Sequence, residues 1–166
     1  MTSTGWGWIR RRCRQVRKAG RALRTSGGRR ALRLGVAATG EHQALLARLQ
    51  PRTVIDVGAN RGQFALDVES ALPHARVISF EPFAAAAAVY RRLFSHRPDY
   101  ALHEHALGSS SGVSTLHVSR ADDSSSLLAI GEGQTKLFPE TTEQRTEAVS
   151  VETMDTALRA QELERP

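Results

Sequence analysis

The sequence predicts an α/β fold built around a parallel β-sheet. Two observations indicate it. Short apolar runs rich in β-branched residues alternate with segments whose apolar residues recur at helical spacing, and Pro or Gly separates the two kinds of segment. A repeated strand–helix–strand order is typical of parallel sheets with right-handed crossovers. The length of 166 residues and the hydrophobic content of 40% fit one globular domain and a tail.

The tail is a basic arm at residues 1–36. It holds 11 of the 23 Lys and Arg residues and none of the 17 Asp and Glu residues, so the arm carries +11 and the remainder −5. Apolar residues from Ile9 to Leu23 recur at helical spacing, and residues 25–30 read TSGGRR, which is typical of a flexible joint. We therefore expect residues 1–36 to form a flexible arm or an amphipathic helix.

Several interpretations of this arm stay open. A solvated basic tail is the default. Trp6 and Trp8 beside the arginines favour contact with an anionic membrane surface, whereas nucleic-acid binding rests on the charge alone. An acid-free, Arg-rich start is also compatible with a transit presequence. No apolar run approaches the roughly 20 residues that span a bilayer, and the single cysteine fits a reducing compartment, so we expect a soluble cytoplasmic protein, peripheral at a membrane if the arm binds one.

The first half of the predicted domain alternates regularly. Leucines at helical spacing predict a helix at 41–50, which Pro51 ends. The apolar, β-branched run TVIDV at 53–57 predicts a strand buried on both faces. Apolar residues from Phe64 to Leu72 recur at i, i+4, i+7 and i+8, so a second helix is expected there, ended by Pro73.

The next elements continue this order and then change character. RVISF at 76–80 predicts the second strand, the alanine-rich residues 83–94 a helix, and residues 99–107 a third strand. VSTLHVS at 113–119 alternates as a half-buried antiparallel strand does, which indicates a hairpin beside the parallel unit.

The last part of the chain begins with a long polar connection at 120–144, and loops of this length are usually functional or mobile. Residues 147–154 read as a last strand, and residues 155–166 as the start of a helix or a frayed end.

The turn after the first strand carries the clearest chemical signal. Asp56 to Gly62 follow the pattern D-x-G-x-x-x-G, and glycines there let a ligand approach the backbone at the carboxyl edge of a parallel sheet. The dinucleotide fingerprint also needs glycines at positions 60 and 63, which are Asn and Gln here. A second acid, Glu81, ends the next strand and can accept both hydroxyls of a ribose. The competing interpretation is structural: Asp56 caps the turn and Glu81 merely precedes a proline.

A family resemblance accompanies this pattern. The segments TVIDVGANRGQFAL, VISFEP, HALGSSSG, STLHVS, DDSSSLL and VSVETMD occur in the order found in the S-adenosylmethionine-dependent methyltransferases of the FkbM family, which the chain resembles from about residue 41 to its end. The resemblance implies a Rossmann-like class I methyltransferase fold, a parallel sheet with an added β-hairpin. It also implies methylation of a small-molecule or glycan hydroxyl, with S-adenosylmethionine as the cofactor.

Carried over residue by residue, the resemblance implies a set of cofactor-binding residues. Around the methionine part these are Asp56, Gly58, Ala59, Asn60 and Gly62; around the ribose and adenine they are Phe80, Glu81, Pro82, Ala106 and Leu107. The absence of lysine from residues 53–82 agrees with a cationic sulfonium ligand.

The catalytic base is not identified by the sequence. His103, His105 and His117 lie on strand-like stretches and read as strand-face histidines. Asp122, Asp123, Ser124, Ser125 and Ser126 can line an acceptor site or form a simple polar loop. No metal-ligand spacing and no nucleophilic triad is evident.

The end of the chain differs from the family's pattern, because domains of this family continue into a further parallel strand. We therefore expect residues 41–166 to be an incomplete methyltransferase domain whose C-terminal half is missing, with the strand at 53–57 left at an exposed edge unless another chain completes the sheet. We expect the isolated chain to have weak or no methyltransferase activity. The alternative function is a noncatalytic cofactor-binding remnant or an interaction module.

Overall fold

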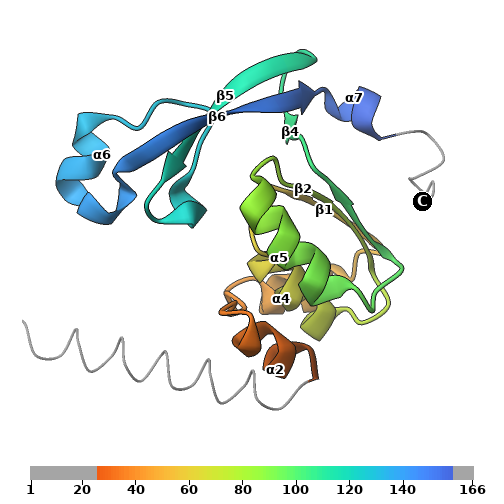
Figure 1. Cartoon of the computed structure of the whole chain (residues 1–166). Helices are drawn as coiled ribbons and strands as arrows, with labels where there is room; N and C mark the ends of the chain where they lie inside the picture. The colour runs from red at the N-terminus through yellow and green to blue at the C-terminus, as the bar shows by residue number, and fades with distance from the viewer. Residues whose placement is uncertain (1–25, 159–166) are drawn as a thin grey trace, which may run out of the picture.

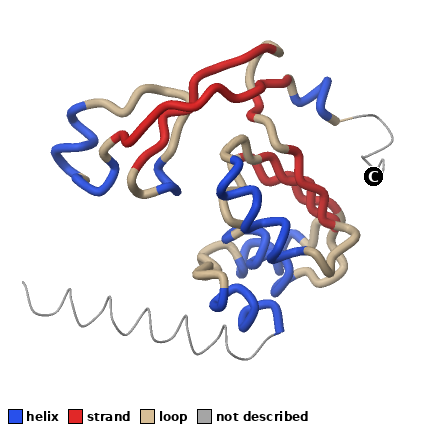
Figure 2. Tube along the Cα trace, in the orientation of Figure 1, coloured by secondary structure: helices blue, strands red, loops and turns tan. Residues whose placement is uncertain are grey.

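Two small β-sheets organise the part of the chain that the structure describes, residues 26–158 (Figure 1, Figure 2). The structure is a computed structural model. The helices are α2 Ser26–Arg33, α3 Gln43–Leu49, α4 Gln63–Ala71, α5 Ala84–Phe94, α6 Glu132–Leu137 and α7 Met154–Ala157, with short 3-10 helices η1 Asp122–Ser124 and η2 Pro139–Thr141. The strands are β1 Thr53–Val57, β2 Arg76–Phe80, β3 Tyr100–His103, β4 Ala106–Leu107, β5 Gly112–Ser119 and β6 Glu143–Glu152.

The first sheet has the order β1-β2-β3 and is parallel throughout. Its strands pair in the registers Val54↔Val77 and Val77↔Tyr100, and α4 and α5 make the crossovers. The helices α2, α4 and α5 lie together on one side of this sheet (Figure 1). Between them and the sheet is the largest buried cluster, which includes Val68, Val77 and Leu93. The predicted α/β fold with a parallel sheet is confirmed.

The second sheet has the order β4-β6-β5 and lies across the carboxyl ends of the first sheet's strands (Figure 1). β5 is antiparallel, as the sequence predicts, and its partner is β6. Phe83, before α5, packs with Leu116 and Val149 of this sheet. The second sheet is thereby held over the end of the first.

The predicted strand at 99–107 is divided between the two sheets. Its first part, β3, ends at His103, whose carbonyl accepts the N–H of Glu81 at 3.0 Å. Its last two residues form β4, in which Ala106 pairs with Val151 of β6. The long connection predicted at 120–144 likewise contains α6 and both 3-10 helices.

The prediction of a flexible joint at 25–30 is wrong, because residues from Ser26 onward form the helix α2. Ala31 and Val36 are buried in the main core, and Arg30 Nη1 donates a hydrogen bond to the Leu93 carbonyl of α5 at 3.0 Å. A Cβ on Gly27 would lie 2.3 Å from Glu69 Oε2, so the glycine permits close packing on α4. The remainder of the predicted arm, residues 1–25, and the chain end at 159–166 lie outside the described residues.

The chain between α2 and α3 is fixed by a buried carboxylate. Asp67 of α4 is fully buried and accepts the backbone N–H of Gly40 at 2.8 and 2.9 Å, the Gln43 side-chain amide at 3.2 Å and the hydroxyl of Thr39. Of the leucines predicted for the helix at 41–50, only Leu46 is buried.

β1 lies at one edge of the first sheet, as the sequence predicts. Within residues 26–158 it pairs only with β2, and its last residue, Val57, is 56% exposed. Among the described helices, none combines the length and apolar character required to cross a bilayer.

Candidate functional site

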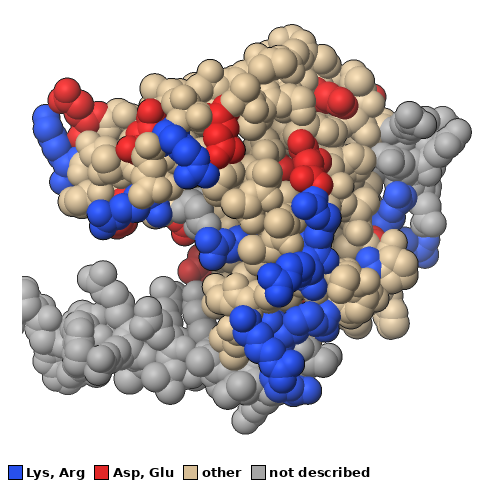
Figure 3. All heavy atoms as spheres, in the orientation of Figure 1, with Lys and Arg blue, Asp and Glu red and all other residues tan. Residues whose placement is uncertain are grey.

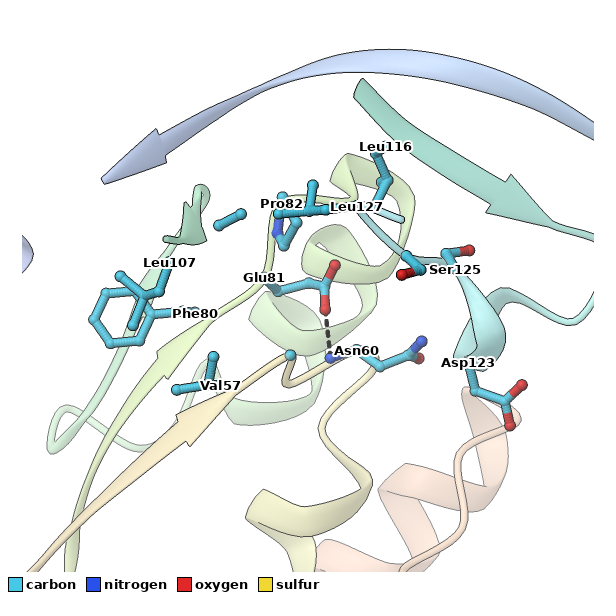
Figure 4. A pocket seen from close by; sticks show the side chains of 13 residues that line it. Val57, Asn60, Phe80, Glu81, Pro82, Leu107, Leu116, Asp123, Ser125 and Leu127 are labelled. Carbon is cyan, nitrogen blue, oxygen red and sulfur yellow. Dashed lines mark hydrogen bonds between the residues drawn. The ribbon is translucent and has the colours of Figure 1, made fainter. Parts of the chain in front are cut away.

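A cavity lies where the carboxyl ends of β1 and β2 meet the second sheet (Figure 4). Its volume is about 230 Å³, somewhat below the ~300–1,000 Å³ of most ligand cavities, so a large ligand would extend past its mouth. The residues that line it are Val57, Gly58, Asn60, Phe80, Glu81, Pro82, Ala106, Leu107, Leu116, Asp123, Ser125, Ser126 and Leu127. Among residues 26–158, the ionisable residues that line it are two acids, Glu81 and Asp123.

Two residues of the glycine-rich turn, Gly58 and Asn60, line the cavity. Gly58 has a φ of 78°, in the left-handed region, and its N–H donates to the Phe80 carbonyl at 2.9 Å. A Cβ added to Gly58 would meet no atom within 4 Å, so this backbone is open to a ligand. Asn60 is also left-handed, with a φ of 47°, and its Oδ1 accepts the N–H of Arg61 at 2.6 Å at the start of α4.

Gly62, the second glycine of the motif, has a different role. Its φ is 93°, and an added Cβ would lie 2.5 Å from Phe94 Cε2 and 3.1 Å from Tyr90 Cδ2. It does not line the cavity. This glycine lets α4 begin directly against α5, so its requirement is packing rather than ligand contact.

Glu81 joins the two loops that border the cavity. One carboxylate oxygen accepts the N–H of Asn60 at 2.7 Å, and the other accepts the N–H of Phe83 at 2.7 Å. The residue is 6% exposed and faces the cavity (Figure 4). A carboxylate has about four acceptor positions, so backbone N–H groups on both oxygens do not preclude hydroxyl ligands.

Asp56 lies beneath the turn as a second buried carboxylate. Burial, and secondarily the charge of Glu81, raises its pKa from 3.8 to about 6. Asp56 is 7% exposed, and its Oδ2 is buried without a hydrogen-bond partner in the described part of the chain. The region therefore holds two carboxylates, of which only Glu81 is hydrogen-bonded to both neighbouring loops.

The structure brings most of the predicted cofactor residues together. Seven of the ten line the cavity: Gly58, Asn60, Phe80, Glu81, Pro82, Ala106 and Leu107. Asp56, Ala59 and Gly62 do not, and Ala59 is 3% exposed with its N–H bonded to the Phe80 carbonyl at 3.0 Å. From the predicted acceptor loop, Asp123, Ser125 and Ser126 line the cavity. Val57, Leu116 and Leu127 were not predicted, since apolar residues carry no chemical signature.

The three candidate histidines lie outside the cavity lining. The His103 ring stacks on Phe80 with centroids 4.9 Å apart, His105 lies 3.7 Å from Glu152, and His117 Nδ1 lies 2.6 Å from Glu143. Across residues 26–158, no three or more His, Cys, Asp or Glu side chains form a group suited to a metal ion. The described geometry thus identifies no base among these histidines.

Comparison with known proteins identifies the family. A model of the methyltransferase FkbM domain matches residues 56–166, which is most of the chain and includes the whole glycine-rich turn and Glu81. Searches among curated proteins and among solved structures each found no significant match. The match confirms the resemblance seen in the sequence: the chain belongs to the FkbM methyltransferase family.

Proposed function

We propose that the protein is an S-adenosylmethionine-dependent methyltransferase of the Rossmann-like class I fold that methylates a hydroxyl of a small molecule or glycan. The observation that carries the proposal is the cavity at the carboxyl edge of the parallel sheet, with Glu81 facing it beside the open backbone of Gly58. Ligands of open parallel sheets bind at this edge. The family membership supports the methyltransferase activity.

The residues present suit this cofactor. Glu81 would accept the ribose hydroxyls, and Phe80 and Leu107 would contact the adenine. Gly58 and Asn60 would lie along the methionine part, and the acids Asp56, Glu81 and Asp123 would favour a cation over a phosphate. When bound, the cofactor supplies an electrophilic methyl group, so the protein's task is to align the acceptor hydroxyl and exclude water.

Calorimetry of the full chain with S-adenosylmethionine tests the cofactor part of this proposal. We expect one saturable site per chain, with S-adenosylhomocysteine competing for it. NADH serves as the matched control, since the glycine spacing does not suit a pyrophosphate. Binding of NADH in place of S-adenosylmethionine, or no binding of either, would contradict the proposal.

The second candidate function is a noncatalytic module that binds cofactor weakly or recruits another chain. The edge position of β1 favours it. Within residues 26–158 β1 pairs only with β2, Val57 is exposed at this edge, and an unpaired strand edge is a template for a further strand. Under this proposal a strand from another chain completes the sheet. Two results together would favour this second function: the isolated chain binds the cofactor without turnover, and turnover is regained when a completing chain is added.

We further propose a cytoplasmic protein that contacts an anionic membrane surface through its basic N-terminal part. Arg29 and Arg33 of α2 are exposed, Leu32 between them is 37% exposed, and Arg92 at the end of the neighbouring α5 is also exposed. Basic side chains gather on the lower part of the face shown in Figure 3, while acidic ones lie mostly in its upper part. An exposed leucine between arginines suits an interface of charged headgroups and acyl chains.

The double substitution Arg33→Glu with Arg92→Glu is expected to reduce binding to phosphatidylserine vesicles roughly tenfold or more, because each basic residue near such a surface is worth about 1 kcal/mol. Vesicle sedimentation of the full chain measures this. Arg145→Glu on β6 makes the same type of charge change on the second sheet and should have little effect. Salt-sensitive nucleic-acid binding with no vesicle binding would be evidence against the membrane.

A further inference from the structure

A second cavity opens on the other side of η1. Its volume is about 540 Å³, within the ~300–1,000 Å³ of ligand cavities. It is built from the long connection between β5 and β6, and its lining residues are Ala121, Asp123, Ser124, Gln134, Phe138, Glu140 and Thr141. Of its lining residues, the cofactor proposal uses only Asp123.

Backbone hydrogen bonds fix the wall of the second cavity. The Arg120 N–H donates to the Thr142 carbonyl at 3.0 Å, and the Ala121 N–H donates to the Glu140 carbonyl at 3.0 Å. These bonds tie η1 to η2 just beyond the β5–β6 ladder. Thr141 is 7% exposed, and its hydroxyl donates to the Phe138 carbonyl at 2.8 Å. Residues of η1 and η2 therefore line the same cavity on a backbone fixed by these hydrogen bonds.

Asp123 lines both cavities. Figure 4 shows the first cavity running from Leu107 and Phe80 at one end, past Glu81, to Asn60 and Asp123 at the other. With the ribose at Glu81 and the methionine part along Asn60, as proposed above, the reactive end of the cofactor points to the side on which Asp123 stands. The second cavity adjoins this end of the first cavity, because Asp123 lines both.

The residues that line the second cavity indicate which kind of ligand it would bind. Among residues 26–158, the ionisable residues that line it are Asp123 and Glu140, and no Lys, Arg or His of that range does. Carboxylates accept hydrogen bonds from hydroxyls and repel anions. Gln134 and Ser124 add further polar groups, and the ring of Phe138 is 54% exposed, so it offers a flat apolar surface. Neighbouring hydroxyls on a ring with one apolar face match this combination.

We propose that the second cavity is the methyl-acceptor subsite and that it takes an uncharged polyhydroxyl ring of the pyranose type, one hydroxyl of which bonds to Asp123 at the junction. Its apolar face lies on Phe138, and Glu140 accepts a second hydroxyl. The assignment as an acceptor subsite rests on the proposed function, whereas the binding of the ring does not.

Amide-resolved NMR of the full chain tests this, with the methyl α-glycosides of glucose, galactose, mannose and rhamnose as probes. At millimolar concentration we expect at least one of them to shift the amides of Ser124, Gln134 and Thr141. Methyl glucuronoside, an anion of equal size, should leave them unshifted. Glu140→Gln should weaken the response at least about fivefold, while Glu132→Gln, an exposed α6 residue paired with Lys136 and outside the cavity lining, should not.

Two results would overturn the inference: no shift with any glycoside, or equal shifts with the glucuronoside. Failure of the proposed function is a separate observation. It would show as glycoside shifts in a chain that binds no S-adenosylmethionine by calorimetry. A chain that binds S-adenosylmethionine but shows no glycoside shifts would contradict the acceptor subsite alone. Glu140→Gln should leave S-adenosylmethionine affinity unchanged, because Glu140 lines only the second cavity.

Discussion

Replacing Glu81 with glutamine is expected to weaken S-adenosylmethionine binding at least about tenfold and to lower the stability of the fold. A hydrogen bond to a charged group contributes about 1.5–3 kcal/mol, and the loss of one accounts for a tenfold effect or more. Stability falls because the carboxylate holds the N–H groups of Asn60 and Phe83 at 2.7 Å. The glutamine amide nitrogen cannot accept either N–H, which leaves one buried donor unsatisfied at about 1–3 kcal/mol.

A control must separate these two effects, because a destabilised loop also binds poorly. Asp67→Asn provides it. Asp67 is likewise a buried carboxylate that accepts a backbone N–H, from Gly40, and it lines neither cavity. Its substitution should lower the denaturation midpoint while leaving cofactor affinity unchanged. Calorimetry and chemical denaturation of both variants measure this. Unchanged affinity in Glu81→Gln would remove Glu81 from the ribose role and leave it as a tie between loops.

The elements nearest the cavity are those that the sequence predicts best, because their signals are local. TVIDV and RVISF are short β-branched runs bounded by Pro or Gly, and both form parallel strands within the predicted ranges. The alanine-rich helix α5 follows from propensity and ends at the predicted residue, Phe94.

Elements that depend on distant partners were predicted poorly. Gly27 and Gly28 locally indicate a flexible joint, yet the segment is helical because Ala31 is buried in the core and Gly27 lies against Glu69. Gly62 belongs to the ligand motif by spacing, but the space that its missing Cβ leaves is taken by Phe94. Neither partner is adjacent in sequence.

The residues that line the cavity also divide into those with a local sequence signal and those that depend on distant partners. Gly58 and Glu81 could be found because an open backbone and a strand-end carboxylate are chemically distinctive. Leu116 and Leu127 could not, since they reach the cavity only through the second sheet and the bridge between His117 and Ser126. The division of 99–107 between two sheets, which places Ala106 and Leu107 at the cavity, likewise depends on pairing with β6.

Replacing Asp56 with asparagine is expected to stabilise the fold at pH 8 by about 1–3 kcal/mol. The folded state raises the pKa of Asp56 from 3.8 to about 6, chiefly by burial. At about 1.4 kcal/mol per pKa unit, the ionised carboxylate costs the folded state about 3 kcal/mol at pH 8 relative to a carboxylate in water. Asparagine removes the charge but keeps polar atoms to be satisfied, so the gain is smaller than the full cost.

The pH dependence of the free energy of unfolding determines the direction of this effect. Between about pH 4 and pH 6 the unfolded chain releases the Asp56 proton while the folded chain still holds it, so the stability of the wild type falls as pH rises through that window. Below about pH 4 both states are protonated and the penalty is absent. The advantage of Asp56→Asn should therefore be small at pH 4 and reach its full size above about pH 6. Chemical denaturation at pH 4 and pH 8 measures it, with the exposed Asp123→Asn as control.

The buried Oδ2 of Asp56 has no hydrogen-bond partner among residues 26–158, and a cationic ligand nearby would stabilise the ionised carboxylate. Cofactor affinity should accordingly fall in the same Asp56→Asn variant whose stability rises at pH 8. A merely structural Asp56, one that caps the turn, would give the opposite result, because removing a useful cap lowers stability. Increased stability together with unchanged affinity would show instead that Asp56 lies too deep beneath Gly58 to act on the ligand, and would leave Glu81 as the site's principal buried charge.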